Sequence, residues 1–163
     1  MPGKVVVIGV GNPLLGDEGL GIASVERLRE EHLPKDVELV EAGTGSLDAL
    51  VDAKDAERVV IVDAIDAGRE PGTLYRLDAR DLLDSDRSPC LSLHELGLRE
   101  SLCLAELEGF RRERLVVVGM QPATVRPSMV LSPIVERRMD ALLSAVRQEI
   151  RRAGNGTYEQ EAG

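Results

Sequence analysis

The sequence predicts an α/β domain of three layers, α/β/α, in which helices cover both faces of a mostly parallel, twisted sheet of about five strands. Two observations lead to this fold class. Runs rich in β-branched residues occur at 4–10, 58–62 and 115–119, and continuous apolar runs of this length are typical of parallel strands buried on both faces. Amphipathic helical stretches lie between these runs, as they do in strand–helix–strand units.

The weaker elements follow from local patterns. Residues 37–40 predict a fourth strand, and Pro71-Gly72 predicts a turn that leads by a hairpin into an antiparallel edge strand at 73–77. Three stretches carry apolar side chains at helical spacing. Their apolar positions are Ile22, Val25 and Leu28; Leu47, Leu50 and Val51; and Val135, Met139, Leu142, Leu143, Val146 and Ile150.

We expect a single domain at residues 1–154 and a flexible C-terminal tail at 155–163. Ser132-Pro133 supplies a cap and a first turn for the last helix, and Gly154 is expected to end it. The tail shows no periodicity. The polar segment 78–88 is expected to form a surface loop or a short helical turn. A chain of 163 residues can bury one core, but it is too short for two ordinary enzyme domains.

The composition excludes several classes of function. The chain has 29 acidic and 20 basic residues, a net charge of −9, and only 2 Tyr, 1 Phe and no Trp. A nucleic-acid partner is not expected, because it would require a basic face or stacking aromatic rings. No apolar run approaches the roughly 20 residues that span a bilayer, and no signal-peptide pattern is present. With Cys90 and Cys103 as the only thiols, we expect a cytoplasmic protein without a membrane partner.

The first strand leads into a glycine-rich turn, residues 9–21 (GVGNPLLGDEGLG). Leu14 stands where a dinucleotide fingerprint requires glycine, and Pro13 lacks the amide that would face a phosphate. Asp17 and Glu18 replace the Lys-Ser/Thr pair of a P-loop. Two carboxylates at a helix N-terminus repel phosphate but attract a cation. The structural alternative is that Asp17 caps the helix and Glu18 complements its dipole.

Two further candidates follow predicted elements. Asp63 lies at the end of the third strand, at the carboxyl edge of the sheet, where it either faces a ligand or caps the next turn. Asp66 is expected in the following loop. His94 lies in the first turn of a helix that a Ser92–Glu95 capping box would begin. The positive helix end favours a neutral imidazole able to bind a metal, although a lone histidine is also commonly structural.

Glu18, Asp63 and His94 together supply an O, O, N ligand set. Three protein ligands with open positions are typical of a catalytic divalent-metal site. Cys90 lies four residues before His94 and suggests a Cys–His nucleophile pair, but it precedes the predicted helix and an inert thiol is the alternative. No G-x-S-x-G motif is present, so serine hydrolysis on an α/β-hydrolase fold has no support.

These motifs together resemble a known family, the nickel–iron hydrogenase maturation endopeptidases. The resemblance covers residues 4 to about 150. It is carried by residues 9–21, by Val62-Asp63-Ala64, by Ser92-x-His94-x-x-Gly97-Leu98, by Pro71-Gly72-Thr73 and by Leu131-Ser132-Pro133.

The resemblance implies a protease, labelled aspartic-type, that removes the C-terminal extension of a hydrogenase large-subunit precursor after nickel insertion. The catalytic and metal-contacting residues of the family fall on Glu18, Asp63 and His94. The expected divalent metal is nickel carried by the precursor, so the free protein is expected to be metal-poor. The family also implies a monomer that meets its precursor transiently. Its acidic-Gly-Gly-Thr segment reads Glu41-Ala42-Gly43-Thr44 here, which makes Glu41 a possible further catalytic residue despite the departures at 41 and 42.

Other functions remain open on the same residues. A metal-dependent hydrolase of another substrate would be active without any hydrogenase precursor. A non-enzymatic nickel-binding maturation chaperone would bind the precursor without shortening it. A purely structural domain would require three independent coincidences, because the three candidate residues come from separate strand or helix ends.

Overall fold

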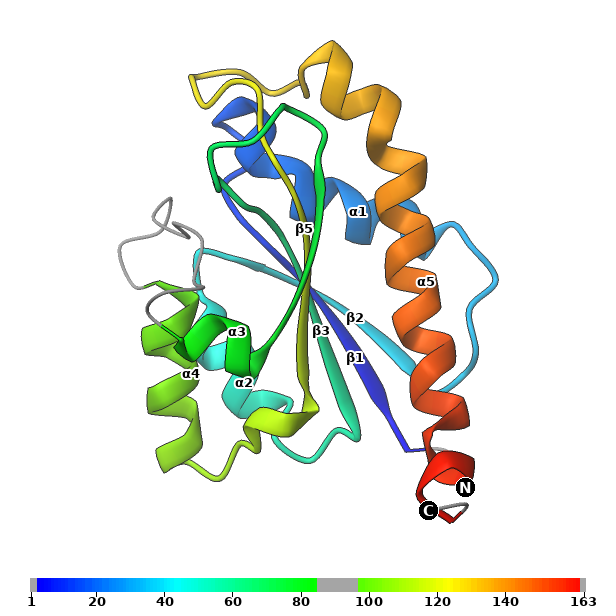
Figure 1. Ribbon diagram of the computed structural model, residues 1–163. Helices are drawn as coiled ribbons and strands as arrows, with labels where there is room; N and C mark the ends of the chain where they lie inside the picture. The colour runs from blue at the N-terminus through cyan, green and yellow to red at the C-terminus, as the bar shows by residue number, and fades with distance from the viewer. Residues whose placement is uncertain (1–2, 85–96, 162–163) are drawn as a thin grey trace.

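The structure is a computed structural model that describes residues 3–84 and 97–161, with side chains described up to residue 154. The strands of the described chain form one sheet in the order β2-β1-β3-β5-β4 (Figure 1). β1, β2, β3 and β5 are parallel to one another, and β4 pairs antiparallel with β5. The strands are β1 Val5–Val10, β2 Val37–Gly43, β3 Arg58–Ala64, β4 Leu74–Asp78 and β5 Leu115–Met120.

Helices cover both faces of this sheet, which confirms the predicted fold class. Figure 1 shows α1 and α5 on one face and α2, α3 and α4 on the other. No helix in the described ranges is both long and apolar enough to cross a membrane. The helices are the 3-10 helix η1 Gly16–Gly19, α1 Leu20–Arg29, α2 Ser46–Asp52, α3 Ala79–Leu83, α4 Leu98–Leu107, the 3-10 helix η2 Arg112–Arg114, and α5 Pro133–Glu161.

The core consists of two apolar layers, one on each face of the central strands. Successive side chains of a strand point to opposite faces, so Val5 and Val7 pack with α1 and α5, whereas Val6 and Ile8 pack with α2 and α4. All residues of β1 and β5 are buried. Continuous apolar runs therefore mark the strands that are covered on both sides, as the sequence predicted.

The predicted hairpin into the edge strand is wrong, although the antiparallel edge strand itself is confirmed. β3 pairs with β1 and β5, so β4 has no place beside β3 and pairs with β5 instead. Burial explains this order. β5 is entirely buried and takes the inner position, whereas β4 has partly exposed and exposed residues and lies at the edge.

The last helix is longer than the sequence predicts. α5 begins at Pro133, as expected, but it continues through Gly154 to Glu161. Helices commonly end at a glycine with positive φ, and Gly154 is not among the described glycines with positive φ. The predicted stop at Gly154 is therefore wrong. In the predicted polar segment, α3 forms a short helical turn with a capping box between Asp78 and Asp81.

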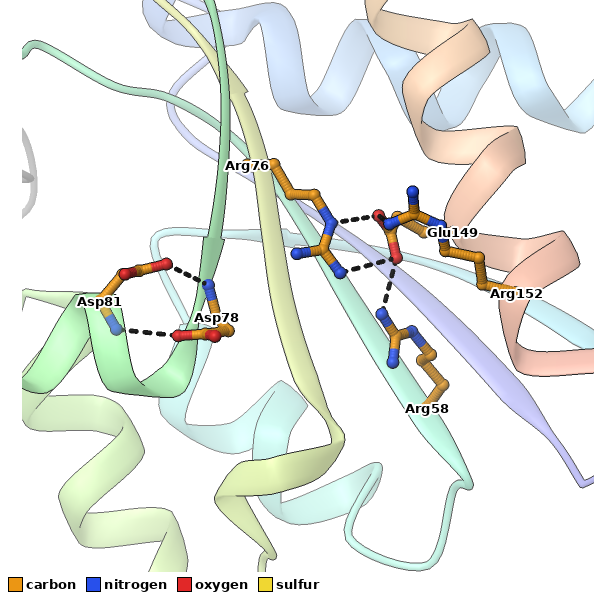
Figure 2. A network of polar contacts seen from close by, with 6 residues as sticks. All are labelled: Arg58, Arg76, Asp78, Asp81, Glu149 and Arg152. Carbon is orange, nitrogen blue, oxygen red and sulfur yellow. Dashed lines mark hydrogen bonds and ion pairs between the residues drawn. The ribbon is translucent and has the colours of Figure 1, made fainter. Parts of the chain in front are cut away.

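Glu149 on α5 is a buried carboxylate that joins the helix to two strands (Figure 2). It accepts hydrogen bonds from Arg58 of β3 at 2.6 Å, from Arg76 of β4, and from Arg152 one turn along α5 at 3.1 Å. Burial alone raises the pKa of Glu149, but the bonds from Arg76 and Arg58 outweigh it, and the pKa lies below its ordinary value of 4.5. The network therefore ties α5 to the sheet across β5.

Glu149→Gln is expected to lower the free energy of unfolding by roughly 2 kcal/mol at neutral pH, because hydrogen bonds to a charged group are lost beneath α5. Urea denaturation followed by circular dichroism measures this. The matched control is Glu136→Gln, also on α5, whose carboxylate pairs with Arg27 at the surface. This exposed pair is expected to contribute less than about 1 kcal/mol. Equal losses of unfolding free energy in the two variants would contradict the conclusion that the Glu149 network stabilises the contact between α5 and the sheet.

The contribution of Glu149 also depends on pH. A carboxylate whose pKa is lowered by folding stabilises the folded state above its unfolded pKa, and this stability is lost as the pH falls through the folded pKa. We therefore expect the difference between wild type and Glu149→Gln to be constant from about pH 7 to about pH 5 and to shrink at more acidic pH. Urea titrations across this range check it; a difference that grows on acidification would refute it.

Candidate functional site

Glu18 and Asp63 lie at the carboxyl edge of the sheet. β1 and β3 run side by side in parallel to this edge. Asp63 is the penultimate residue of β3 and is 1 % exposed. Glu18 lies in η1, the first helical element after β1, and is 3 % exposed. η1 packs against β3. The structure thus brings two of the three predicted ligand residues to one edge.

Gly11 lies between these two residues. Its φ is 130°, and a Cβ at this position would lie 2.0 Å from the Glu18 carbonyl oxygen and 3.8 Å from Asp63 Oδ1. A Cβ on Gly21, in the first turn of α1, would lie 2.3 Å from the Val62 carbonyl oxygen. The glycines of the 9–21 turn therefore allow η1 and α1 to rest directly on the ends of β1 and β3.

The Asp63 carboxylate is bound by the backbone amide of the next residue. Asp63 Oδ1 accepts a hydrogen bond from the Ala64 amide at 2.8 Å. In the sheet, Asp63 pairs with Gly119 of β5, so its main chain is fixed by a central ladder. This arrangement orients a buried carboxylate at the edge with little freedom to move.

Asp17 does not cap a helix, and that alternative is wrong. In the part of the chain that the structure describes, neither η1 nor α1 has a side-chain cap. The fully buried Asp17 carboxylate instead accepts bonds from the amides of Ala123 at 2.8 Å, Thr124 at 3.0 Å and Ser132 at 2.7 Å, and from the Ser132 hydroxyl at 2.7 Å. Asp17 therefore holds both ends of the segment between β5 and α5.

Gln121 is a residue at this edge that the sequence analysis missed. It directly follows β5 and is buried. Its Oε1 accepts bonds from the Tyr75 hydroxyl at 2.7 Å and the Ala67 amide at 2.9 Å, and its Nε2 donates to Asp66 at 2.9 Å. The bond from Gln121, followed by one from the Gly68 amide, lowers the pKa of Asp66. A single glutamine after a strand belongs to no motif, so only the fold shows that it orders the β3–β4 loop.

Glu41 is bound elsewhere. Its carboxylate accepts a hydrogen bond from Arg29, in the last turn of α1, at 2.8 Å. Both side chains are partly exposed. The structure therefore gives Glu41 a partner on the surface of α1, and its catalytic role stays a prediction.

His94, Ser92, Glu95 and Cys90 lie outside the described residues, so their predicted roles are not tested. α4 begins at Leu98 with Gly97 as its N-cap. Among the residues that the structure does describe, no three His, Cys, Asp or Glu side chains form a group that could hold a metal ion. The ligand set of Glu18, Asp63 and His94 therefore stays a prediction.

Solved structures show which class of protein has this fold. The hydrogenase maturating endopeptidase HybD from Escherichia coli is similar with a TM-score of 0.80 and 31 % identity, over 93 % of this chain and 94 % of that one. The [NiFe] hydrogenase maturation protease HycI from Thermococcus kodakarensis is similar with a TM-score of 0.71 and 25 % identity, over 91 % and 92 %. The fold is that of an endopeptidase.

Sequence comparisons give the family. A family model described as hydrogenase maturation protease matches residues 22–149. The hydrogenase 2 maturation protease of Escherichia coli K12 is 32 % identical over 166 residues, 98 % of each chain. The hydrogenase expression/formation protein HupD of Rhodobacter capsulatus is 34 % identical over 155 residues, 94 % of this chain and 74 % of that one. The chain belongs to the hydrogenase maturation protease family and is a peptide-bond hydrolase; these relatives do not support the aspartic-type label.

Asp17→Ala is expected to lower the free energy of unfolding by roughly 4 kcal/mol, because a fully buried carboxylate is lost and three backbone amides and a hydroxyl lose their acceptor at once. Thermal and urea denaturation measure the loss. Ser132→Ala, which removes only the hydroxyl donor, is the control and is expected to cost about 1 kcal/mol. A loss for Asp17→Ala no larger than that of Ser132→Ala would show that Asp17 is not the centre of this contact.

Gly11→Ala is expected to destabilise the protein by more than about 3 kcal/mol, because its Cβ would overlap the Glu18 carbonyl oxygen. Gly43→Ala is the matched control. Gly43 also has a positive φ, of 57°, but a Cβ there meets nothing within 4 Å, so only the backbone cost of about 1–2 kcal/mol remains. Equilibrium unfolding of both variants compares the two costs; similar values would contradict the close approach at Gly11.

Proposed function

We propose that this chain removes the C-terminal extension of a nickel–iron hydrogenase large-subunit precursor after nickel has been inserted. The observation that carries the proposal is the convergence of two buried carboxylates, Glu18 and Asp63, at the carboxyl edge of a sheet with an endopeptidase fold. In α/β sheets this edge is where ligands bind. The names of the relatives, among them a hydrogenase 2 maturation protease, support a hydrogenase as the substrate.

Nickel enters this proposal as cargo of the precursor. Glu18 and Asp63 would offer carboxylate oxygens and His94 an imidazole nitrogen, which are donors that divalent transition metals accept. The thiolates of the precursor would occupy the remaining positions. Two carboxylates and one imidazole form a weak nickel site by themselves, so the protease would bind nickel firmly only when the loaded precursor is docked.

Peptide-bond cleavage in this proposal depends on how the precursor is positioned at the site. Contact between the metal and the protease would place the scissile peptide beside the carboxylates. The metal or one of the carboxylates would then activate a water molecule, and the scissile carbonyl would be polarised for attack. Asp63 is held by the Ala64 amide and the Glu18 backbone contacts Gly11. Because these residues are ordered before the substrate arrives, little entropy is lost on binding.

A processing assay tests the proposal. Nickel-loaded precursor is incubated with wild type, Glu18→Gln, Asp63→Asn and His94→Ala, and the shortened product is quantified by mass spectrometry. Each of the three variants is expected to cleave at least about 100-fold more slowly. Glu136→Gln, which alters a surface pair on α5, is the control and is expected to match wild type.

Three outcomes of this assay would overturn parts of the proposal. Cleavage at the wild-type rate by all three variants would show that these residues are not the catalytic site. Rapid cleavage of the metal-free precursor would contradict the proposed recognition of nickel and favour a hydrolase whose activity does not depend on the metal. Stable binding of the precursor without shortening would favour a maturation chaperone. Glu41→Gln in the same assay decides whether Glu41 takes part.

We further propose that the protein works in the cytoplasm as a monomer that meets its precursor transiently. Cys103 is an exposed free thiol, which suits a reducing compartment. Sedimentation of the free protein and cell fractionation test these two statements.

A further inference from the structure

Exposed apolar side chains gather at one place beside the candidate site. The described residues include six large apolar side chains with high exposure, and four of these lie on two loops. Leu14 lies on the loop between β1 and η1, and Val125, Met129 and Val130 lie between β5 and α5. The other two, Leu104 and Leu107, lie on α4. We name residues 12–16 and 122–131, with these four side chains, the loop platform.

The two loops of the platform are bound to each other. Leu15 and Ser128 form a β-bridge, Gly16 N donates to the Ser128 carbonyl at 2.8 Å, and Ser128 N donates to the Leu14 carbonyl at 3.0 Å. The four hydrogen bonds that the Asp17 carboxylate accepts from residues 123, 124 and 132 fix the second loop as well. The apolar side chains are therefore held on an ordered backbone, and their exposure does not come from a frayed segment.

The loop platform adjoins the predicted catalytic residues. Its first loop runs directly into η1, which carries Glu18, and Figure 1 shows both loops at the end of the sheet where β1, β3 and β5 finish. A small hollow of about 90 Å³ opens between the platform and α1, lined by Pro13, Ile22, Ala23, Glu26, Met129 and Leu131 with two glycines. A polypeptide whose scissile bond reaches Glu18 would therefore pass beside this apolar surface.

The charge of the loop platform indicates what it binds. The chain has a net charge of −9, but the only charged residue in 12–16 and 122–131 is Arg126, which is exposed. Glu26 of α1, which lines the hollow, is the neighbouring carboxylate, but the two loops themselves carry only the cation of Arg126. An apolar segment with an acidic residue therefore finds both apolar contacts and a cation on the loops. Ordered apolar side chains around a single charge form a typical protein-binding surface.

We propose that the loop platform docks an apolar segment of the hydrogenase precursor, with an acidic residue of that segment facing Arg126. This inference rests on the proposed function, because it takes the precursor as the substrate. In this inference the polypeptide is bound by Leu14, Val125, Met129 and Val130. Recognition of the metal remains with the neighbouring carboxylates.

The test separates binding from chemistry. In the double variant Leu14→Ser/Met129→Ser, KM for nickel-loaded precursor is expected to rise about tenfold or more with kcat within about twofold of wild type. Arg126→Glu is expected to raise KM at low salt, and the effect shrinks at high salt. The matched control is Leu107→Ser on α4, because Leu107 is 82 % exposed and Met129 is 83 % exposed. All variants are checked for unchanged melting temperature.

Binding of metal-free precursor, measured by calorimetry, makes the result independent of cleavage. Platform variants are expected to weaken this binding while Leu107→Ser does not. If wild type cleaves the precursor and the platform variants match Leu107→Ser, the docking surface is wrong and the proposed function stands. If wild type never cleaves but the platform variants lose affinity, the proposed function fails and the docking surface stands. A wild-type dimer that Met129→Ser dissociates, with KM unchanged, would assign the surface to a second copy and overturn the inference.

Discussion

The buried carboxylate of Asp17 is the contact on which the carboxyl edge of this protein depends. A fully buried carboxylate is unfavourable unless hydrogen bonds replace its lost water, and here the donors come from both ends of the segment that joins β5 to α5. That segment is consequently tied to η1, the turn that carries Glu18. One side chain thereby sets the start of α5, the position of η1 and the ordered loops of the platform.

The glycine-rich turn is the second constraint, and it acts by removing side chains. Close approach of Gly11 to the Glu18 carbonyl, and of Gly21 to the end of β3, lets the first helical segment lie directly on the sheet. In nucleotide-binding turns glycines leave room for a phosphate. Here they leave room for backbone, namely the carbonyl groups of Glu18 and Val62.

Two polar networks lie in different parts of the sheet. Around Glu149, three arginines from β3, β4 and α5 hold the long helix against the sheet. At the carboxyl edge, Gln121 orders the β3–β4 loop beside Asp63. The Glu149 network contains none of the predicted catalytic residues, whereas the carboxyl edge combines buried carboxylates with an exposed apolar surface. The predicted catalytic carboxylates and the proposed docking surface thus lie on neighbouring segments of one edge.

The sequence by itself determined the fold class, the central strands, the core faces of the helices, and the presence of acidic residues at the ends of the first and third strands, because burial leaves a periodic pattern in the chain. It also carried the family, through the spacing of glycines, acids and histidine. Only the tertiary structure decided that β4 pairs with β5 and that α5 continues past Gly154. The same holds for three side-chain contacts: Asp17 binds the β5–α5 segment, Arg29 binds Glu41, and Gln121 orders a distant loop. Each of these depends on contacts between residues far apart in the chain or on the backbone angle of one residue, and neither leaves a local pattern that can be read along the sequence.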